Sequence, residues 1–372
     1  MATDFDAEGL LEGLDGEARE TRRKLLEKLE ADGIELDELR EACEEGRLAL
    51  LPLERVLAPP GARYTFAEMA EKAELELEFL AHLTRALGLP MPETDEATFT
   101  DADVKAAKTV GGFRAAGIPD DALLEITRVL GHSTSQIVAA LRSMFTQVLF
   151  QQGDSEYEVA VRWAAAAENL NPILEDVLQY VLRAQQVTQL RQGVFDLAGL
   201  GSAATQISVA FADLAGFTRL GEQVAADQLG SVAGRLTALA TDAAQPPVRL
   251  VKMIGDAAML ISPEPRDLLE AVLKLVDAVD AEGEEFPPLR AGIACGQGLS
   301  RGGDWFGAPV NLASRITDKT RPGAVVVSAE FKDQVGEDGY GWSKLPGKRK
   351  FKGIADDQVL FRVRRPNGDE ES

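Results

Sequence analysis

One aspartate stands directly after a short apolar segment near the middle of the chain. The segment at residues 207–211, Ile-Ser-Val-Ala-Phe, is typical of a β-strand and delivers Asp213 to the strand's end. Gly216 then allows a tight turn, and Thr218 begins a helical pattern. A carboxylate at a strand end, beside a turn and a helix N-terminus, is suited to hold a cation against a phosphate. The alternative interpretation is that Asp213 caps the following helix.

A second carboxylate, Asp256, stands in a Gly-Asp turn between two strongly apolar segments. These segments predict a hairpin, and a hairpin beside the strand of Asp213 would bring the two carboxylates together. Carboxylates that approach closely repel each other unless a cation lies between them, and Mg²⁺ is the usual cation where a phosphate is also present. The turn chemistry of Gly-Asp is the alternative explanation. It leaves Lys252 unexplained, because a long cation in an otherwise apolar strand needs a polar partner.

A third polar cluster, at residues 304–315, combines an acid, an amide and a guanidinium. Asn311 and Arg315 are four residues apart, so on a helix they share one face. An amide and a guanidinium on one face suit a sugar oxygen and a phosphate. The alternative is that both are surface polar residues of an amphipathic helix. Taken alone, this segment does not decide between the two.

The elements that must position these residues alternate between strands and helices after Ser202. The pattern predicts a βαββαβ core with additions, in which helices pack on a mainly antiparallel sheet in the ferredoxin-like α+β arrangement. We assign this domain to residues 204–372. The expected strands lie at 204–212, 247–253, 257–262, 288–296 and 324–328, with two or three more near the C-terminus, and the expected helices lie at 216–243, 266–281, 307–318 and 329–335.

The first half of the chain, residues 1–185, is predicted to be an all-α domain. Residues 186–203 are predicted to be a linker or switch segment that joins it to the second domain. One helix is expected to start from an N-cap at Ser133, and a long helical stretch at 156–190 is expected to break at Pro172. The apolar positions of that stretch leave two possibilities open, pairing with a partner chain or packing within the chain.

The composition argues against nucleic-acid and membrane partners. The formal net charge of −22 repels phosphate backbones and anionic lipid surfaces. A helix pair within residues 64–90 is similar to a DNA-binding helix-turn-helix of a transcription regulator, but its second helix begins with glutamates at 74–78 and would be repelled by DNA. No apolar stretch reaches the ~18 residues of a transmembrane segment, and the acidic N-terminus does not look like a signal peptide. We expect a cytoplasmic protein with Cys43 and Cys295 as reduced thiols.

The three clusters together resemble the class III nucleotidyl cyclases, the adenylate and guanylate cyclases, over residues 204–364. The resemblance implies that Asp213 and Asp256 bind metal, with the backbone carbonyl of Leu214 as a further ligand. The cofactor would be Mg²⁺ or Mn²⁺, with two ions per active site. Lys252 and Asp304 would select the purine, and Asn311 would position the ribose. Arg315 would stabilise the transition state, and Lys352 would bind phosphate.

The resemblance also implies a substrate and an assembly. Adenine presents an acceptor at N1 and a donor at its 6-amino group, which match the ammonium of Lys252 and the carboxylate of Asp304, whereas guanine reverses both. ATP would therefore be the substrate, and cyclic AMP and pyrophosphate the products. In this family the metal-binding pair comes from one protomer and the other site residues come from its partner. This chain carries both sets, so a homodimer would have two equivalent sites.

The helical first half is similar to that of actinobacterial soluble cyclases whose N-terminal domain inhibits the catalytic domain, in some cases in response to pH. His132 and His82 are the candidates for a pH response, against the alternative that both are ordinary surface histidines. Two other functions compete with the adenylate cyclase. One is a diguanylate-type cyclase, favoured by Gly302-Gly303-Asp304 alone, and the other is a cyclase-like scaffold that has lost activity and serves as a dimeric sensor.

Overall fold

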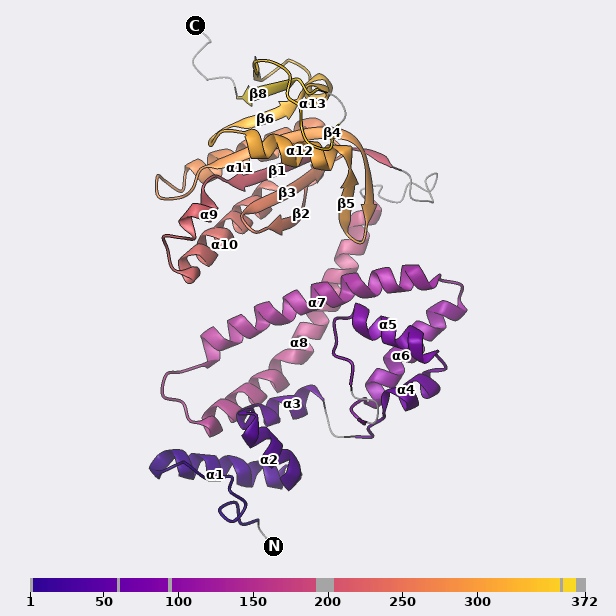
Figure 1. The fold of residues 1–372 in the computed structure, drawn as a ribbon, viewed down its shortest axis with the longest axis vertical. Helices are drawn as coiled ribbons and strands as arrows, with labels where there is room; N and C mark the ends of the chain where they lie inside the picture. Colours follow the sequence, from indigo (N-terminus) through magenta and orange to yellow (C-terminus); the bar gives the residue numbers. More distant parts are fainter. Residues whose placement is uncertain (1–2, 59–60, 93–95, 192–203, 355–356, 366–372) are drawn as a thin grey trace. The chain divides into compact units, whose positions relative to one another are not determined.

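The computed structural model describes residues 3–58, 61–92, 96–191, 204–354 and 357–365. It divides into two compact units, Met1–Val187 and Thr188–Ser372, of which the first is helical and the second is built on one sheet (Figure 1). The predicted fold class, an all-α domain followed by an α+β domain, is confirmed. Of the predicted linker, residues 186–191 continue helix α8 (Glu156–Arg191), and residues 192–203 lie outside the described residues.

The first unit consists of short helices followed by two long ones. They enclose two small cores, one around Leu26 of the first helix and one around Phe79 of the fifth, and Ala160 of α8 is buried in the former. Most of the two long helices therefore remains at the surface. The helices are α1 (Gly16–Ala31), α2 (Leu36–Glu44), the short 3₁₀ helix η1 (Leu48–Leu50), α3 (Leu51–Leu57), α4 (Phe66–Ala73), α5 (Leu77–Ala86), α6 (Asp101–Ala115), α7 (Asp120–Leu149) and α8.

Helix α7 runs without a break from Asp120 to Leu149, so the predicted N-cap at Ser133 is wrong. The glycine in this segment instead allows α7 to pack closely against α5. Gly131 lies where α7 crosses the end of α5, and a Cβ at this glycine would lie 2.5 Å from the carbonyl oxygen of Leu87. The glycine lets the two backbones touch, and the polar residues that follow it are exposed on a continuous helix.

Helix α8 passes through Pro172, so the predicted break at this residue is also wrong. A proline inside a helix removes the hydrogen bond to the carbonyl four residues earlier. That carbonyl belongs to Glu168, which is exposed, so water can replace the missing donor. The helix continues because the lost bond is solvated rather than buried.

The second unit is an eight-stranded sheet in the order β2-β3-β1-β4-β6-β8-β7, with β5 paired to β4. All pairings are antiparallel except that of β4 with β6, so the sheet is mainly antiparallel, as predicted. Its elements are β1 (Thr205–Leu214), α9 (Phe217–Leu220), α10 (Ala226–Ala243), β2 (Arg249–Ile254), β3 (Ala257–Ser262), α11 (Pro265–Asp280), β4 (Leu289–Arg301), β5 (Asp304–Gly307), α12 (Ala308–Lys319), β6 (Val325–Ser328), α13 (Ala329–Val335), β7 (Gly341–Lys344) and β8 (Leu360–Arg364).

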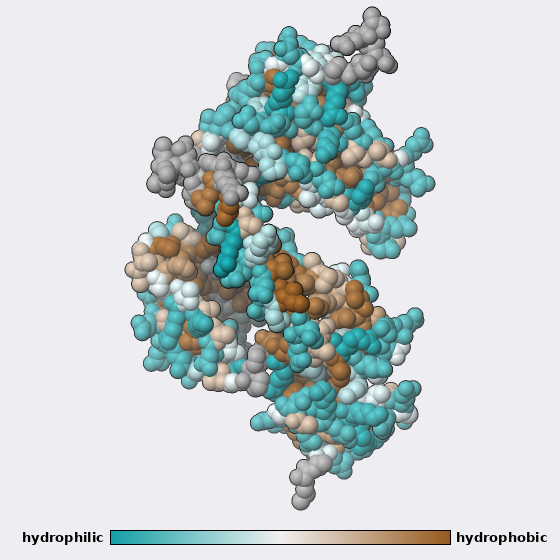
Figure 2. All heavy atoms as spheres, turned by 180° about the vertical axis from the view of Figure 1, so that it is seen from behind, coloured by the Kyte–Doolittle hydropathy of each residue, from teal (hydrophilic) through white to brown (hydrophobic). Residues whose placement is uncertain are grey.

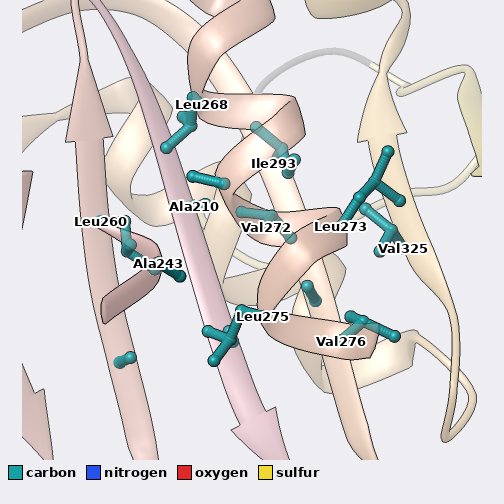
Figure 3. Packing of buried hydrophobic residues seen from close by; sticks show 14 of the residues in the cluster. Ala210, Ala243, Leu260, Leu268, Val272, Leu273, Leu275, Val276, Ile293 and Val325 are labelled. Atoms are coloured by element: carbon teal, nitrogen blue, oxygen red, sulfur yellow. The ribbon is translucent and has the colours of Figure 1, made fainter. Parts of the chain in front are cut away.

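The central strand β1 buries apolar side chains on both of its faces. Ala210 faces the core beneath α11, together with Val272 (Figure 3). Val209 and Phe211 face the other core, which includes residues of α12. Because successive side chains of a strand point to opposite faces, Asp213, two residues beyond Phe211, lies on the α12 side of the sheet. The alternation that buries the strand also fixes where its terminal carboxylate points.

Candidate active site

Two carboxylates meet where β1 ends. Asp213 is the partner of Ala257 in the β1–β3 pairing, so the preceding residue, Asp256, lies in the β2–β3 turn beside it. The backbone amide of Leu214 donates to the carbonyl of Asp256 at 3.2 Å, which fastens the turn to the end of β1. Burial, and then the negative charge of Asp213, raise the pKa of the Asp256 carboxyl. The hairpin expected from the sequence thus brings both acids together.

This pair has the chemistry of a site for a hard divalent cation. A carboxyl whose pKa is raised by a neighbouring carboxylate gains from a cation placed between the two, and oxygen donors suit Mg²⁺ and Mn²⁺. Within the described residues, no group of three or more Asp, Glu, His or Cys side chains is arranged around a metal position. Further ligands would therefore be backbone oxygens, such as that of Leu214, and oxygens of water or phosphate.

Arg290 belongs to this site and was not predicted. It is the residue opposite Asp213 in the β1–β4 pairing, and its Nε and Nη2 donate to Asp213 Oδ2 at 2.9 and 2.5 Å. Its Nη1 reaches the backbone carbonyl of Asp318 near the end of α12, at 3.4 Å. The sequence signal was present, because Arg290 is a charge inside an apolar strand, the feature that singled out Lys252.

Lys252 finds the polar partner that its position requires. Its Nζ forms an ion pair with Oδ2 of Asp304, which joins β2 to the β4–β5 hairpin. The other oxygen, Oδ1, accepts from the backbone amide of Trp305 at 2.8 Å. The register of β2 against β3 shifts between Leu250 and Lys252, and such a bulge redirects a side chain. The two side chains are partly exposed, so a ligand could insert between the ammonium and the carboxylate.

Helix α12 lies very close to the sheet. Gly292 of β4 makes this possible, because a Cβ there would lie 2.4 Å from the backbone nitrogen of Thr317 and 2.6 Å from the carbonyl oxygen of Ala313. The hydroxyl of Thr317 donates to the carbonyl of Phe211 at 3.2 Å and ties the helix to β1. A glycine on the sheet and a buried hydroxyl on the helix therefore set how closely α12 approaches the sheet.

The exposed face of α12 carries Asn311 and Arg315, as the spacing predicted. Arg315 Nη1 lies 3.5 Å from Oδ2 of Asp318, whose backbone carbonyl accepts from Arg290. Lys352 is exposed in a turn and follows Phe351, whose ring is buried in the α12-side core.

The structure thus joins the predicted residues in pairs within one chain. Asp213 lies with Asp256, Lys252 with Asp304, and Asn311 on one helical face with Arg315.

The two histidines are exposed on helices of the first unit, His82 on α5 and His132 on α7. The Nε2 atom of His132 lies 3.1 Å from the side-chain nitrogen of Gln136 on the same helix. Because the predicted N-cap at Ser133 is absent, His132 lies inside a helix rather than ahead of one. The structure gives neither histidine an acidic hydrogen-bond partner among the described residues.

Comparison with known proteins gives the chain a family. A family model described as adenylate cyclase regulatory domain matches residues 3–192, and one described as adenylate and guanylate cyclase catalytic domain matches residues 202–361. A pH-sensitive adenylate cyclase of Mycobacterium tuberculosis is 39% identical over 98% of this chain and 93% of its own length. The chain belongs to the class III adenylate cyclase family.

Other relatives extend the comparison. An adenylate cyclase of Streptomyces coelicolor is 30% identical to this cyclase over 77% of this chain and 75% of its own length. Among solved structures, the adenylyl cyclase CyaB from P. aeruginosa is 22% identical, and it covers 46% of this chain and 99% of its own chain with a TM-score of 0.39. The expected family is confirmed for both halves of the chain. Within the ranges that the structure describes, no helix of the cyclase is long and apolar enough to cross a bilayer.

Proposed function

We propose that this cyclase converts ATP to 3′,5′-cyclic AMP and pyrophosphate, at two equivalent sites of a homodimer with two Mg²⁺ or Mn²⁺ ions each. The observation that carries the proposal is the convergence of Asp213 and Asp256 at the end of β1. In the reaction the 3′-oxygen of the ribose attacks the α-phosphorus and pyrophosphate leaves. Bound metal ions would supply positive charge at the attacking oxygen and at the phosphates.

Asp213, Asp256 and the backbone carbonyl of Leu214 would hold the metal ions. Arg290 occupies one oxygen of Asp213 and offsets its charge. A cation bound to Asp213 would share the negative charge of this carboxylate, so the charge of Arg290 is then less fully offset and can also attract an anionic ligand. Arg290 therefore suits the phosphate side of the site.

Lys252 and Asp304 would select adenine over guanine. In the structure the two side chains satisfy each other. Adenine replaces that ion pair with two hydrogen bonds, from Lys252 to N1 and from the 6-amino group to Asp304. Guanine carries a donor at N1 and an acceptor at C6, so it leaves both side chains without a matching group. The selectivity is thus a difference in unpaired polar groups rather than in shape.

Asn311, Arg315 and Lys352 would act on the ribose and the phosphates. Asn311 orients the ribose through its amide, so that the 3′-oxygen is in line with the leaving group. Arg315 and Lys352 bring positive charge to the phosphate oxygens as negative charge develops on them. All three side chains are exposed in the single chain, as groups that receive a ligand from a partner's side must be.

The dimer is supported by the apolar surface of the second unit. Among the described residues from 204 onward, the exposed large hydrophobics are Ile254 and Phe306. Ile254 lies two residues before Asp256, and Phe306 lies two residues after Asp304. The domain thus exposes apolar side chains beside a carboxylate of the metal-binding pair and beside a carboxylate of the purine-selecting pair. A second protomer that covers both places would bury them.

Regulation by the helical unit is part of the proposal. A shared site responds to small rotations of one protomer against the other, because these separate the Asp pair from Asn311 and Arg315. If His132 and His82 are the pH input, replacing both by alanine flattens the pH–activity profile between pH 5.5 and 8. An unchanged profile in the double variant removes histidine sensing and leaves the catalytic proposal intact.

The function is tested by incubating the full chain with ATP or GTP and Mg²⁺ or Mn²⁺ across a range of pH and assaying the cyclic nucleotide. We expect cyclic AMP from ATP, and absence of product under every condition overturns the proposal. Asp213→Ala and Arg315→Ala are each expected to be inactive, and mixing the two is expected to restore one site in each mixed dimer. Failure of the mixture to recover activity would count against the shared site.

A further inference from the structure

Strand β4 presents only glycine and alanine to the α12 side of the sheet between residues 292 and 298. Gly292, Ala294, Gly296 and Gly298 are two residues apart, so these positions share one face. A glycine inside a strand weakens the strand and often marks a place where another segment approaches closely. Gly292 makes room for α12, whereas Gly296 and Gly298 lie farther along β4, toward the hairpin that carries Asp304.

Apolar side chains cover both of these glycines. A Cβ at Gly296 would lie 3.5 Å from Cδ of Pro309, which is in the first turn of α12. A Cβ at Gly298 would lie 3.4 Å from the ring atom Cε3 of Trp305 and 2.5 Å from Cδ1 of Ile207 on β1. The indole of Trp305 and the side chain of Ile207 therefore both lie over the bare backbone of Gly298, an arrangement that we call the Gly298 contact.

The Gly298 contact holds a part of the sheet that has little other support. Strand β5 lies outside the main path of the sheet and pairs with β4 (Figure 1), and a two-stranded hairpin is only marginally stable by itself. Over the sheet unit, the face drawn in Figure 2 is mainly hydrophilic, because this unit keeps most apolar side chains inside. On β5, Phe306 is 52% exposed, whereas Trp305 packs half-buried against the α12-side core. Trp305 is therefore the side chain that fastens β5 to the sheet.

The position of this hairpin decides whether Asp304 can reach Lys252. Lys252 is opposite Met259 of β3, which belongs to the α12-side core, so the lysine also lies on that side of the sheet. Strands β3 and β1 separate β2 from β4, and three strand spacings amount to about 14 Å. The hairpin must therefore lean across the α12 side of the sheet for the ion pair of Asp304 with Lys252 to form.

Trp305 also acts on Asp304 through the backbone. Asp304 Oδ1 accepts from the backbone amide of Trp305 at 2.8 Å, which leaves Oδ2 for Lys252. The direction of this amide follows from the placement of β5, and the Gly298 contact sets that placement. The orientation of the carboxylate thus depends on an indole that does not itself touch Lys252 or its partner oxygen.

We propose that Trp305, held over Gly298 beside Ile207, is a positioning residue that sets the preference for ATP over GTP by fixing the carboxylate of Asp304. The inference rests on the proposed function, in which Asp304 and Lys252 select the purine. A carboxylate that is held in place cannot turn away from the carbonyl oxygen of guanine, so the mismatched base leaves it unpaired. A carboxylate that is free to turn toward water loses less with guanine and also binds adenine less well.

Trp305→Leu in the full chain tests the positioning role. The ratio of kcat/KM for ATP to that for GTP is expected to fall by about tenfold or more, with a raised KM for ATP and a kcat that changes by less than about threefold. Trp305→Phe keeps a ring over Gly298 and should retain most of the preference. Trp342→Leu, which removes another half-buried indole of the same unit, is the matched control: it should lower the melting temperature and leave the ratio unchanged. An unchanged ratio in folded Trp305→Leu would overturn the proposal.

Gly298→Ala disturbs the same contact from the strand below and leaves the indole in place. The added methyl group would press on Ile207 and Trp305, so the preference for ATP is expected to fall as in Trp305→Leu. Ile207→Ala in the same chain removes the atoms that the methyl group meets first, and it should restore most of the preference. If Gly298→Ala keeps the wild-type ratio, or if Ile207→Ala restores nothing, the Gly298 contact does not position Asp304 and the proposal is wrong.

Binding measurements separate this proposal from the proposed function. Dissociation constants of methylanthraniloyl-labelled ATP and GTP, measured by fluorescence with Mg²⁺, give the preference without turnover. A wild type that forms no cyclic nucleotide but binds the ATP analogue more tightly refutes the proposed function, and the ratio of the two constants in the same variants still tests Trp305. Equal binding of the two analogues by the wild type refutes purine selection and, with it, the role of Trp305.

Discussion

The two units of this chain differ in how completely each buries its own apolar surface. The sheet unit is covered by helices, and its described residues from 204 onward leave Ile254 and Phe306 as exposed large hydrophobics. The helical unit has two small cores and exposes many apolar side chains along α7 and α8. A sheet with helices on both faces closes on itself, whereas a row of helices keeps a face that only a further element can cover.

The units also differ in where they place charge. The sheet unit holds Lys252, Arg290 and Asp256 among apolar strands, where each needs a partner and where burial helps to raise the pKa of Asp256. In the helical unit most ion pairs lie at the surface and contribute little to stability. Charges placed among apolar strands thus mark the unit that matches the cyclase catalytic domain, whereas exposed apolar residues are concentrated in the helical unit.

The largest expected effect separates chemistry from folding. Asp213→Asn keeps the shape of the side chain and removes its charge, so we expect cyclic AMP formation to fall by about 10³-fold or more while both units stay folded. Activity with saturating Mn²⁺ and a thermal melt measure the two properties. Asp227→Asn, an exposed carboxylate on α10, is the control and should retain activity. A loss of less than tenfold in Asp213→Asn would remove this residue from the metal site.

The next effect sharpens the assignment of the purine pair to the sheet unit. Lys252→Glu combined with Asp304→Cys is expected to shift the ratio of kcat/KM for ATP and GTP by about 10²-fold toward GTP, because the new side chains match the edge of guanine. Lys274→Glu, the same charge change on the exposed side of α11, should leave the ratio unchanged. An unaltered preference for ATP in the double variant contradicts the pair's role.

Two glycines test whether close packing matters equally in the two units. Gly292→Ala forces a methyl group against Thr317 and Ala313 in the closed unit, and we expect about 3 kcal/mol of destabilisation. Gly131→Ala meets the backbone of Leu87, but α7 is largely exposed and can shift, so about 1 kcal/mol is expected. Chemical denaturation measures both. Gly230→Ala is the control: a Cβ there has nothing within 4 Å, so the change should be neutral or stabilising. Equal destabilisation at Gly131 and Gly292 would contradict the difference between the two units.

The smallest effect concerns pH. Because burial and Asp213 raise the pKa of Asp256, the folded chain holds a proton on this carboxyl more tightly than the unfolded chain does. The resulting stability is present below the unfolded pKa and is lost as pH rises through the folded pKa. The loss is small, because the carboxyl is partly exposed and solvent screens its charge.

Asp256→Asn should abolish this component. Melting temperatures of wild type and variant, measured with chelator and then with Mg²⁺ from pH 4 to 7, give the difference. Parallel pH profiles for the two proteins under chelator would mean that the carboxylates do not interact.

The sequence predicted the second unit much better than the long helices of the first. The strand at 257–262 and the helix at 329–335 match the observed elements residue for residue. The strand is an apolar run that follows a Gly-Asp turn, and the helix lies between its N-cap Ser328 and Gly336. The errors at Ser133 and Pro172 have a common cause. Local signals for a helix end were given more weight than the neighbours and solvent that let the helices continue.

The sequence predicted the residue types of the candidate site and how they pair, but one residue of the site was missed. Arg290 was overlooked because its partner, Asp213, is 77 residues earlier and only the register of β1 with β4 sets them side by side. Lys252 was singled out because a lysine in an apolar strand needs a polar partner, whichever residue that partner is. A systematic search for charges inside apolar strands would have found both.

By itself, the sequence determined which side chains are available for chemistry and the order in which strands and helices present them. Alternating hydrophobicity sets the face of each strand, so the position of Asp213 at the end of β1 follows from local pattern alone. Tertiary structure decided which of these groups meet. The pairing of Asp213 with Arg290 and of Lys252 with Asp304, and the depth of α12 over Gly292, depend on strand register and backbone approach between distant segments. Those quantities arise only when the whole sheet is assembled, because no local stretch of chain contains both partners.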